Sequence, residues 1–569
     1  MNFLKMILFQ TKEVTMNKNF NYCLAAAVIL CSFSQKSIAQ VTTEQVIVTQ
    51  DYKPTISDAF KLNDNPSIID TPPPILVLKY PIITKYIDRK LNLSAINPAI
   101  MKGEPLTKLY RGYVKAGLGN YSSPYGECFI NNLRSKRYSI GAHAKHFSSK
   151  ATLNDVGFAG FSNNDVRLYG KYFVPNHILS AESNFNSNLI HYYGFNSNIY
   201  DSDSLRDETK DRYTNIDGKF QFESTYKDSS VFNHNIGLTY YNFSDIGSTV
   251  ENNVKVTVTG SKYLTKELIG GTISFDYYDY KYTGTPTTAG IVLINPFIKF
   301  SGTKWQANMG INTTIETDQN KTHFLPNLAF KYNVVENIFA AYAELIGTNK
   351  RNSFKSLALE NPFILHTLPL KNTTTKADAK IGFRGSYSSK LSFNVFGSYQ
   401  ICEQMPLYTS YAANTLQNKF TVVYDDINIL TVHGEVSFTQ KEKLNISLKA
   451  NYFNYTTKNE VKAWYKPVFE VGLLGKYNLE DKILVSLDVF TIGSQIAQLN
   501  ELDANTGSTL VSQKTLKGIT DINVGVEYRY NKKLSTFIRF NNIAGMRYYR
   551  WNNYPTQKFN LMAGLTYSF

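Results

Sequence analysis

The feature that most constrains this chain is an alternation of apolar and polar residues with a period of two, which recurs up to the last residue. In "TDINVGVEYRY" one face holds Ile522, Val524 and Val526, and polar or small residues lie between them. The same alternation occurs in "KLNISLKANY" and "KADAKIGFRGSY", and the chain ends on it in "QKFNLMAGLTYSF". Because successive side chains of a strand point to opposite faces, these stretches predict strands with one apolar and one polar face. The composition supports strands, because the chain has 40 Tyr and 36 Phe but only 8 Met, and aromatic residues favour strands.

Short polar turns and long connections separate these stretches. Ten short turns begin at Arg134, Pro175, Lys227, Thr265, Gly302, Val335, Ser388, Lys441, Glu480 and Asn531. Long connections are expected at residues 196–213, 347–371, 402–424, 494–515 and 542–557. Tight turns at one end and long loops at the other are typical of outer-membrane barrels. Ten turns separate eleven hairpins, which predicts about 22 strands.

The fold class predicted from this pattern is all-β: a transmembrane, antiparallel, up-and-down β-barrel over residues 110–569. A closed barrel has no free edge, so its last strand must pair with its first. A chain that ends inside that last strand leaves no tail at the seam. We expect the terminal Phe569 to lie at the membrane interface, where aromatic residues collect.

Residues 1–39 have the features of a signal peptide. Lys5, Lys12 and Lys18 precede the apolar stretch "YCLAAAVILCSF", and Ser37 and Ala39 have the small side chains that a signal peptidase accepts. We expect cleavage after Ala39 and a location in the bacterial outer membrane. No apolar run of about 18 residues follows, so no transmembrane helix is predicted.

The net charge of the chain indicates which classes of binding partner are favoured. Removing the four Lys and one Glu of residues 1–39 from the formal charge of +15 leaves +12. In an exported protein this basic excess favours lipid head groups or an acidic solute over nucleic acid, so no nucleic-acid partner is predicted. Cys128 and Cys402 remain after cleavage and are far apart in sequence, which favours two isolated thiols over one disulfide.

The last 36 residues, "LSTFIRFNNIAGMRYYRWNNYPTQKFNLMAGLTYSF", resemble the last two strands of TonB-dependent outer-membrane receptors. The resemblance rests on Asn542 and Ile543, Tyr548 and Tyr549, Tyr554 and Pro555, and the terminal Phe569. It covers this segment closely and the rest of the barrel by pattern only. It implies a receptor-like barrel that takes part in solute passage.

Residues 40–109 depart from that family, because 70 residues are too few for a folded plug domain. The stretch "VIVT", which is Val46, Ile47, Val48 and Thr49, is similar to the leading segment of such plugs and implies a contact with TonB. The segment also resembles the start of plugless, receptor-like barrels of Bacteroidota. "DTPPPILVLKYP" predicts an extended strap, because Pro72 to Pro74 fix φ and donate no hydrogen bonds. The strap either lies in the lumen or extends into the periplasm.

No motif of a hydrolase, a zinc protease, a nucleotide-binding loop or a dinucleotide site occurs in the chain. We therefore predict no enzyme activity, no catalytic residue, no cofactor and no metal. The acidic stretch "DSDSLRDETKD", Asp201 to Asp211, begins like a Ca²⁺ loop, but Leu205 occupies a ligand position and no glycine follows. We interpret it as a solvated outer loop.

If the apolar faces contact lipid, the charged residues between them face the lumen, because charge against lipid costs several kcal/mol. The predicted lumen-facing residues are Lys380, Arg384, His433, Glu435, Lys449, Asp521, Glu527 and Arg529, together with Lys115, Lys145, Lys171 and Lys219 from the first strands. Two interpretations stay open: the charges pair and solvate the interior, or their basic excess favours anionic solutes or seats the strap.

Two functions are compatible with these features. In the first, the barrel passes a solute across the outer membrane, by diffusion or by coupling through "VIVT". In the second, it is a structural or assembly subunit whose strap and long loops bind periplasmic or other envelope proteins. Outer-membrane lipid is a partner in both.

Overall fold

The computed structural model describes residues 109–226, 231–282, 285–336, 338–502 and 508–569. The predicted signal peptide, almost the whole predicted strap and the "VIVT" contact lie outside these ranges. The chain divides into two units, residues 1–102 and 103–569, and the description below concerns the second.

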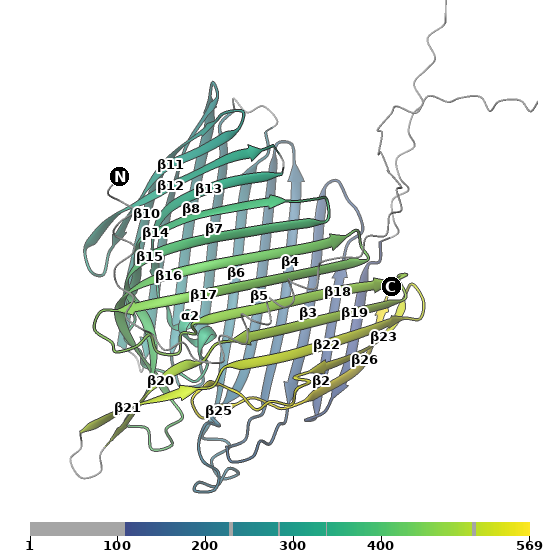
Figure 1. Ribbon diagram of the computed structural model, residues 1–569, viewed down its shortest axis with the longest axis vertical. Coiled ribbons are helices and arrows are strands. Elements are labelled where there is room, and N and C mark those ends of the chain that lie inside the picture. The colour runs from purple at the N-terminus through teal and green to yellow at the C-terminus, as the bar shows by residue number, and fades with distance from the viewer. Residues whose placement is uncertain (1–108, 227–230, 283–284, 337, 503–507) are drawn as a thin grey trace, which may run out of the picture. The chain divides into compact units, whose positions relative to one another are not determined.

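Twenty-two strands of the described residues form one antiparallel sheet that closes on itself, as the pattern predicted (Figure 1). The barrel strands are β1 (Gly112–Gly119), β2 (Ser123–Asn131), β3 (Tyr138–Ser149), β4 (Phe161–Val174), β5 (His177–His191), β6 (Lys210–Ser224), β7 (Asn233–Ser244), β8 (Val250–Leu264), β9 (Glu267–Tyr282), β10 (Thr285–Ser301), β11 (Trp305–Glu316), β12 (Lys321–Val335), β13 (Phe339–Arg351), β14 (Asn372–Ser386), β15 (Leu391–Ser410), β16 (Phe420–Gln440), β17 (Leu444–Thr457), β18 (Phe469–Leu479), β19 (Ile483–Ile492), β22 (Ile519–Arg529), β23 (Leu534–Asn541) and β26 (Asn560–Ser568). Each pairs with its neighbours in chain order, so the topology is up-and-down.

The seam of the barrel joins the last strand to the first, as expected for a chain that ends inside a strand. β26 pairs antiparallel with β1 from Ser568 opposite Tyr113 to Met562 opposite Gly119. The N–H of Phe569 donates to the carbonyl of Gly112 at 3.0 Å. The terminal residue therefore completes the ladder, and no edge is left unpaired within the described barrel.

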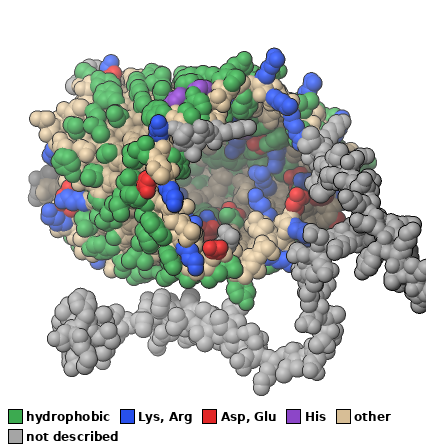
Figure 2. Space-filling view, turned by 90° about the horizontal axis from the view of Figure 1, so that it is seen from above, with side chains coloured by type: hydrophobic (Ala, Val, Ile, Leu, Met, Phe, Trp, Pro, Cys, Tyr) green, Lys and Arg blue, Asp and Glu red, His purple; other side chains and the backbone are tan. Residues whose placement is uncertain are grey.

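The outer face of the barrel is apolar, and the inner face is polar. On β14, Ile381 and Phe383 point outward and are 68% and 47% exposed to solvent in the isolated chain, which is the surface that lipid would cover. Lys380 and Arg384 alternate with them and point to the other face. Figure 2 shows the barrel hollowed, with basic and acidic side chains on the wall of the hollow.

Three of the predicted long connections contain strands, which corrects the prediction there. In 402–424, β15 continues to Ser410 and β16 begins at Phe420; a bulge between Cys402 and Met405 breaks the alternation and hides this pairing in the sequence. Residues 494–515 contain a separate hairpin of β20 (Gln495–Leu502) and β21 (Thr509–Leu516). Residues 542–557 contain the short pair β24 (Tyr549–Trp551) and β25 (Tyr554–Pro555). Of the other two connections, 196–213 shifts to residues 192–209 at equal length, and 347–371 shortens to residues 352–371.

One helix, α2 (Phe354–Glu360), occurs among the described residues, and it lies within the 352–371 connection. No helix in the described part of the chain is long and apolar enough to cross a membrane. The main apolar cluster gathers around α2, near the end of the barrel that carries β20, β21 and β25 (Figure 1). Cys128 and Cys402 are both free thiols, as favoured from their spacing.

Candidate functional site: a loop packed inside the barrel

The connection from β13 to β14, residues 352–371, folds into the barrel, and we call it the inner loop. Its local sequence explains the helix. Ser353 is the N-cap, and its hydroxyl accepts the N–H of Ser356 at 3.1 Å. Phe354, Leu357 and Ala358 have the spacing of one helix face, and all three are buried. The helix therefore forms because one face packs against the barrel wall.

A carboxylate on β8 holds the start of α2. Glu251 is 1% exposed, and its oxygens accept the N–H of Phe354 at 2.6 Å and the N–H of Lys355 at 3.3 Å. The hydroxyl of Tyr241 donates to the same carboxylate at 2.8 Å. Negative charge beside the free N–H groups of a helix start is stabilising, so Glu251 determines where the helix begins.

Tyrosine hydroxyls from the wall donate to the backbone carbonyls of the inner loop. Tyr213 on β6 donates to Pro362 at 2.9 Å, and Tyr280 on β9 donates to His366 at 2.7 Å. The hydroxyl of Tyr192, just after β5, lies 3.0 Å from both the carbonyl of Ile364 and Asp211 Oδ2, and its one proton goes to one of these oxygens. These bonds satisfy carbonyls that have no strand partner and would otherwise be buried unpaired.

The other side of the inner loop is attached to β15 and β16. The N–H of Leu365 donates to the carbonyl of Phe420 at 2.9 Å, and the N–H of Phe420 donates to the carbonyl of Phe363 at 2.9 Å. Tyr408 on β15 donates to Glu360 at 3.1 Å. Because β6–β9 and β15–β16 are well separated in strand order on both sides, the inner loop bridges two distant parts of the wall.

Aromatic residues from other loops pack against the inner loop. The rings of Phe363 and Tyr554 stack with centroids 3.5 Å apart. Trp551 lies 5.0 Å from Tyr408 and 4.9 Å from Tyr465 between ring centroids. We call the inner loop and the loops 192–209, 411–419, 458–468 and 542–559 the cap. All of its parts except the loop 411–419 contribute to one apolar cluster, so one of these loops cannot move far without disturbing the others.

An acidic and histidine cluster fastens the inner loop to β6 and to the end of β7. The side chains of Asp211, Asp245 and His366 lie with their potential ligand atoms within 4.8 Å of one another. His366 Nδ1 is 2.5 Å from Asp245 Oδ2. Such a set is able to hold a divalent cation, but three of the four carboxylate oxygens already accept from His366 and from the N–H groups of Arg212, Ile246 and Thr249, and the fourth, Asp211 Oδ2, lies 3.0 Å from the Tyr192 hydroxyl. The cluster therefore needs no ion to account for its contacts.

Asp211 corrects one prediction, because the stretch Asp201 to Asp211 was interpreted as a solvated loop. Asp201 and Asp203 are exposed, but Asp211 belongs to β6 and is 2% exposed. Lys419 lies over the ring of Tyr192 at 4.7 Å. Burial lowers the pKa of Lys419, and the nearby carboxylates of Asp211 and Asp245 oppose that shift.

The predicted lumen residues on β14, β16 and β17 alternate with outward apolar residues, and several pair with their neighbours. Lys380 lies 3.4 Å from Glu344. Lys449 lies 3.2 Å from Glu435, which is its partner in the β16–β17 register. His433 Nδ1 lies within hydrogen-bond distance of the side-chain oxygen of Asn451, at 2.6 Å. These pairs join adjacent strands and do not cross the lumen.

The remaining predicted residues lie elsewhere on the wall. Asp521 is buried and accepts from Tyr548 at 2.6 Å. Arg529 Nε lies 3.9 Å from Glu527. Lys115 lies over the ring of Phe537 at 4.1 Å. Lys145, Lys171 and Lys219 form no ion pair within the part of the chain that the structure describes. The structure thus distributes the predicted residues over the wall, and their role in passage stays a prediction.

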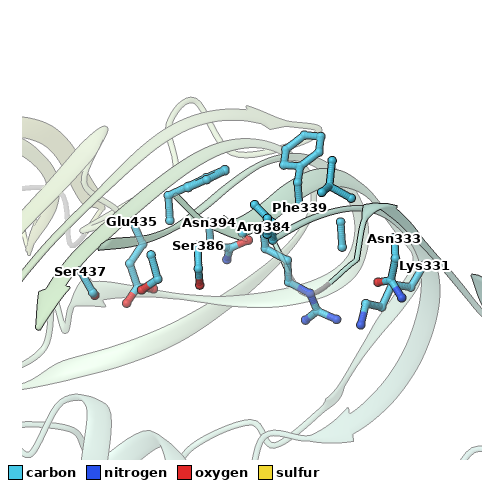
Figure 3. Close-up of a pocket in the computed structure, with 14 residues that line it drawn as sticks. Lys331, Asn333, Phe339, Arg384, Ser386, Asn394, Glu435 and Ser437 are labelled. Carbon is cyan, nitrogen blue, oxygen red and sulfur yellow. The ribbon is translucent and has the colours of Figure 1, made fainter. Parts of the chain in front are cut away.

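Arg384 and Glu435 line the same pocket, of about 510 Å³, on the inner wall near the short turns. Figure 3 shows the guanidinium of Arg384 pointing into this pocket, with Lys331 on one side and Glu435 on the other. Within the described residues, Lys331 and Arg384 have no carboxylate partner. The pocket is therefore a basic recess on the wall.

Comparison with known proteins identifies the fold of the barrel. No family model and no curated protein matches the chain. Among solved structures, the FrpB iron transporter from Neisseria meningitidis matches with a TM-score of 0.63 and 10% identity, over 82% of each chain. The siderophore receptor PirA from Acinetobacter baumannii matches with 0.62 and 10%, over 82% of this chain and 81% of that one. The pyoverdine outer-membrane receptor FpvA from Pseudomonas aeruginosa matches with 0.58 and 11%, over 82% and 79%.

The barrel has the fold of these outer-membrane receptors. The predicted resemblance to TonB-dependent receptors is confirmed at the level of fold, and so is the outer-membrane type of the barrel. The solved structures that share this fold are described as receptors and transporters. The plugless organisation and the bacterial group stay predictions.

Sequence reasoning missed the inner loop. A signal for it was present: "NSFKSLALENP", residues 352–362, places a good N-cap before apolar residues with helical spacing. This pattern within a predicted long loop indicates a segment that packs against something. The sequence could not show that its partners are residues on β6–β9 and β15–β16.

Proposed function

We propose that this protein passes a solute across the outer membrane, and that the inner loop limits the passage. The observation that carries the proposal is the double attachment of the inner loop, to β6–β9 through Tyr213 and Tyr280 and to β15–β16 through Phe420. A segment that bridges the wall inside a polar lumen restricts whatever passes there. The receptor fold supports the same function.

Single-channel conductance in planar bilayers tests the proposal. Replacing residues 354–366 by a Gly-Ser linker of equal length removes both attachments, and we expect a clear rise in conductance over the parent protein. The matched control shortens the connection from β20 to β21, residues 501–510, and should conduct like the parent.

The same conductance assay tests the N-terminal segment, because a strap in the lumen would also restrict passage. Deletion of Gln40 to Tyr80 alone and together with the linker replacement gives four combinations. If the doubly altered protein is folded and still does not conduct, solute passage through this barrel is refuted.

We also propose that the "VIVT" segment couples uptake to the inner membrane and that the long loops contact other envelope proteins. Replacing Val46 to Thr49 by Gly and Ser should abolish solute uptake by cells while leaving bilayer conductance unchanged. The mass of the protein extracted in mild detergent reports whether companions are present.

A further inference from the structure

The basic recess around Arg384 lies at the end of the strands that points away from the inner loop. β13 begins beside the recess at Phe339 and ends at Arg351, where the inner loop starts. The strand ends that flank the turns from β12 to β13 and from β14 to β15 line the recess, and short turns of bacterial outer-membrane barrels face the periplasm. Its volume of about 510 Å³ is within the range of small-molecule sites. A solute that has passed the inner loop would therefore meet the recess on the periplasmic side of the lumen.

The strand register places the polar lining of the recess on one face of the sheet. Arg384 on β14 is the cross-strand partner of Asn394 on β15, and Asn394 is the partner of Glu435 on β16. Partners in neighbouring strands point to the same side. In the next row toward the turns, the three partners on these strands are all serines: Ser386, Ser392 and Ser437. Their short side chains leave room beside the long side chain of Arg384, and each of them lines the recess.

Tyr342 on β13 orients two of the hydrogen-bond donors. The guanidinium of Arg384 lies over its ring, 5.3 Å from the centroid. Its hydroxyl donates to Asn394 Oδ1 at 2.9 Å, so the N–H₂ group of that amide remains available as a donor. Figure 3 shows Arg384 and Asn394 side by side in the recess, with Lys331 beyond Arg384. The donors of the recess are thus accessible from the lumen and are directed by a neighbouring ring.

The recess carries two positive charges that no carboxylate of the described residues neutralises, those of Lys331 and Arg384. Glu435 is the one carboxylate among the described residues that line the recess, and it is paired with Lys449 at 3.2 Å. The hydroxyl groups of the three serines add neutral donors. This set of donors favours an anion with more than one charge and several acceptor oxygens.

A phosphate group has these properties. It carries between one and two negative charges near neutral pH and has three strong acceptor oxygens when esterified, whereas a carboxylate carries one charge on two oxygens. Arginine binds phosphate with a fork of two N–H groups, and lysine binds it as a point charge. The two cations and the neutral donors of the recess therefore match a phosphate group better than a carboxylate.

We propose that the basic recess binds a phosphate group, either as the free ion or esterified to a small solute, through Arg384, Lys331 and the amide of Asn394. This proposal rests on the proposed function, because it names the class of solute that passes the barrel. It differs from a general attraction of anions by the lumen, to which every unpaired lysine of the wall, such as Lys171, contributes equally.

Isothermal titration calorimetry on the full protein tests the site, at low salt because screening weakens exposed charges. The probes are glucose 6-phosphate, inorganic phosphate, gluconate and glucose. We expect both phosphates to bind, gluconate to bind at least about tenfold more weakly, and glucose to give no heat. Tighter binding of glucose 6-phosphate would identify an organic phosphate as the ligand, and tighter binding of inorganic phosphate would identify the free ion; each result supports the site.

Variants connect the binding to the recess. Arg384→Gln and Lys331→Gln each remove one positive charge, and each should weaken the phosphate probes by about tenfold or more. Lys171→Gln on β4 is the matched control, because it removes the same charge from a wall position that does not line the recess, and its affinity should stay within about twofold of the parent. Migration of unheated protein in gel electrophoresis confirms that each variant is folded.

Four results would overturn the proposal. These are absence of heat with both phosphates, binding of gluconate as tight as that of the phosphates, equal weakening by Lys171→Gln and Arg384→Gln, and binding that appears only after deletion of Gln40 to Tyr80. The last result would mean that the chain's own N-terminal segment excludes the solute from the recess.

The conductance assay separates this proposal from the proposed function. If the phosphates bind and the folded, doubly altered protein still does not conduct, passage is refuted and the phosphate site stands. If that protein conducts and the parent binds neither phosphate, the site is refuted and passage stands.

Discussion

Glu251 illustrates how a single buried side chain determines the position of a loop. Its carboxylate lies on β8, far from the inner loop in sequence, yet it accepts the first two N–H groups of α2. A carboxylate accepts at both oxygens, whereas an amide at the same place must turn one N–H₂ group toward other donors. Two acceptor oxygens are therefore required for this contact.

We predict that Glu251→Gln loosens the start of α2. A buried hydrogen bond to a charged group contributes about 2 kcal/mol, which corresponds to an increase of about thirtyfold in the opening equilibrium. Amide hydrogen exchange of residues 354–358 measures it, and the barrel strands should exchange as in the parent. Unchanged protection of these amides would contradict the assigned role.

His433, Glu435 and Lys449 form a group on the lumen wall, and one substitution can change the net charge of this group. Lys449 is half-exposed and lies 3.2 Å from Glu435. Its replacement by an acid puts two carboxylates opposite each other in the β16–β17 register, which is unfavourable for the strand pair and makes the wall locally acidic.

We predict that Lys449→Glu shifts ion preference toward cations when it is introduced into the variant that lacks residues 354–366. The measurement is the reversal potential in a salt gradient, and Lys449→Gln should give an intermediate value. The shift should diminish at high salt, because screening weakens the field of an exposed charge. Identical selectivity of all three proteins would show that ions do not pass this wall.

The cap is an element made of several loops, and its tyrosines make it sensitive to alkaline pH. Tyr192, Tyr193 and Tyr554 lie outside the barrel strands, and burial raises the pKa of each above the ordinary value of 10.0. In the closed cap these hydroxyls stay protonated, whereas in an opened cap they ionise near pH 10. The contribution to cap stability is therefore complete below pH 10 and is lost as the pH rises above it.

We predict that Tyr554 does not titrate at pH 10 in the closed cap. The difference in absorbance at 295 nm between the parent and Tyr554→Phe should stay absent through pH 10 and develop only at higher pH. A difference centred at pH 10 would mean that this hydroxyl is in contact with water, contrary to its bond with the carbonyl of Asn418.

Closure of the sheet into a barrel depends on the pairing of β1 with β26. Gly564 on β26 lies close to the backbone of β1 and to the ring of Phe537. A Cβ at this position would collide with the carbonyl oxygen of Ala116 and lie 2.7 Å from both Gly117 Cα and a ring carbon of Phe537. A Cβ on Gly472 of β18 would meet no atom within 4 Å, so Gly472 offers a matched comparison.

We predict that Gly564→Ala prevents closure and that Gly472→Ala does not. The measure is the fraction of refolded protein that migrates as the compact form in unheated gels. Close approach of backbones leaves no room for even one methyl group in the first case. Equal folded fractions for the two variants would show that the seam tolerates more separation than the structure has.

Features of this fold that depend on local sequence could be predicted, whereas features that depend on contacts between distant residues could not. Strand direction, the number of strands and the final pairing followed from residues such as Ile522, Val524 and Val526, because alternation is a local property and the bilayer makes the same demand of every strand. The strand extensions beyond Cys402 were missed because a bulge shifts the alternation by one residue. The period of two therefore predicts strands wherever it is unbroken, and the short turns and long loops between them predict the barrel.

The interior was decided by tertiary structure alone. Asp211 and His366 are separated by more than a hundred residues, and so are Glu251 and Phe354, and nothing in either neighbourhood indicates the partner. Gln495 and Asp378 are far apart in sequence, yet both line one pocket beside the same aromatic rings. Alternation determines which side chains face inward, but closure of the sheet and folding of the inner loop determine which of them meet, because these contacts join residues that no local pattern relates.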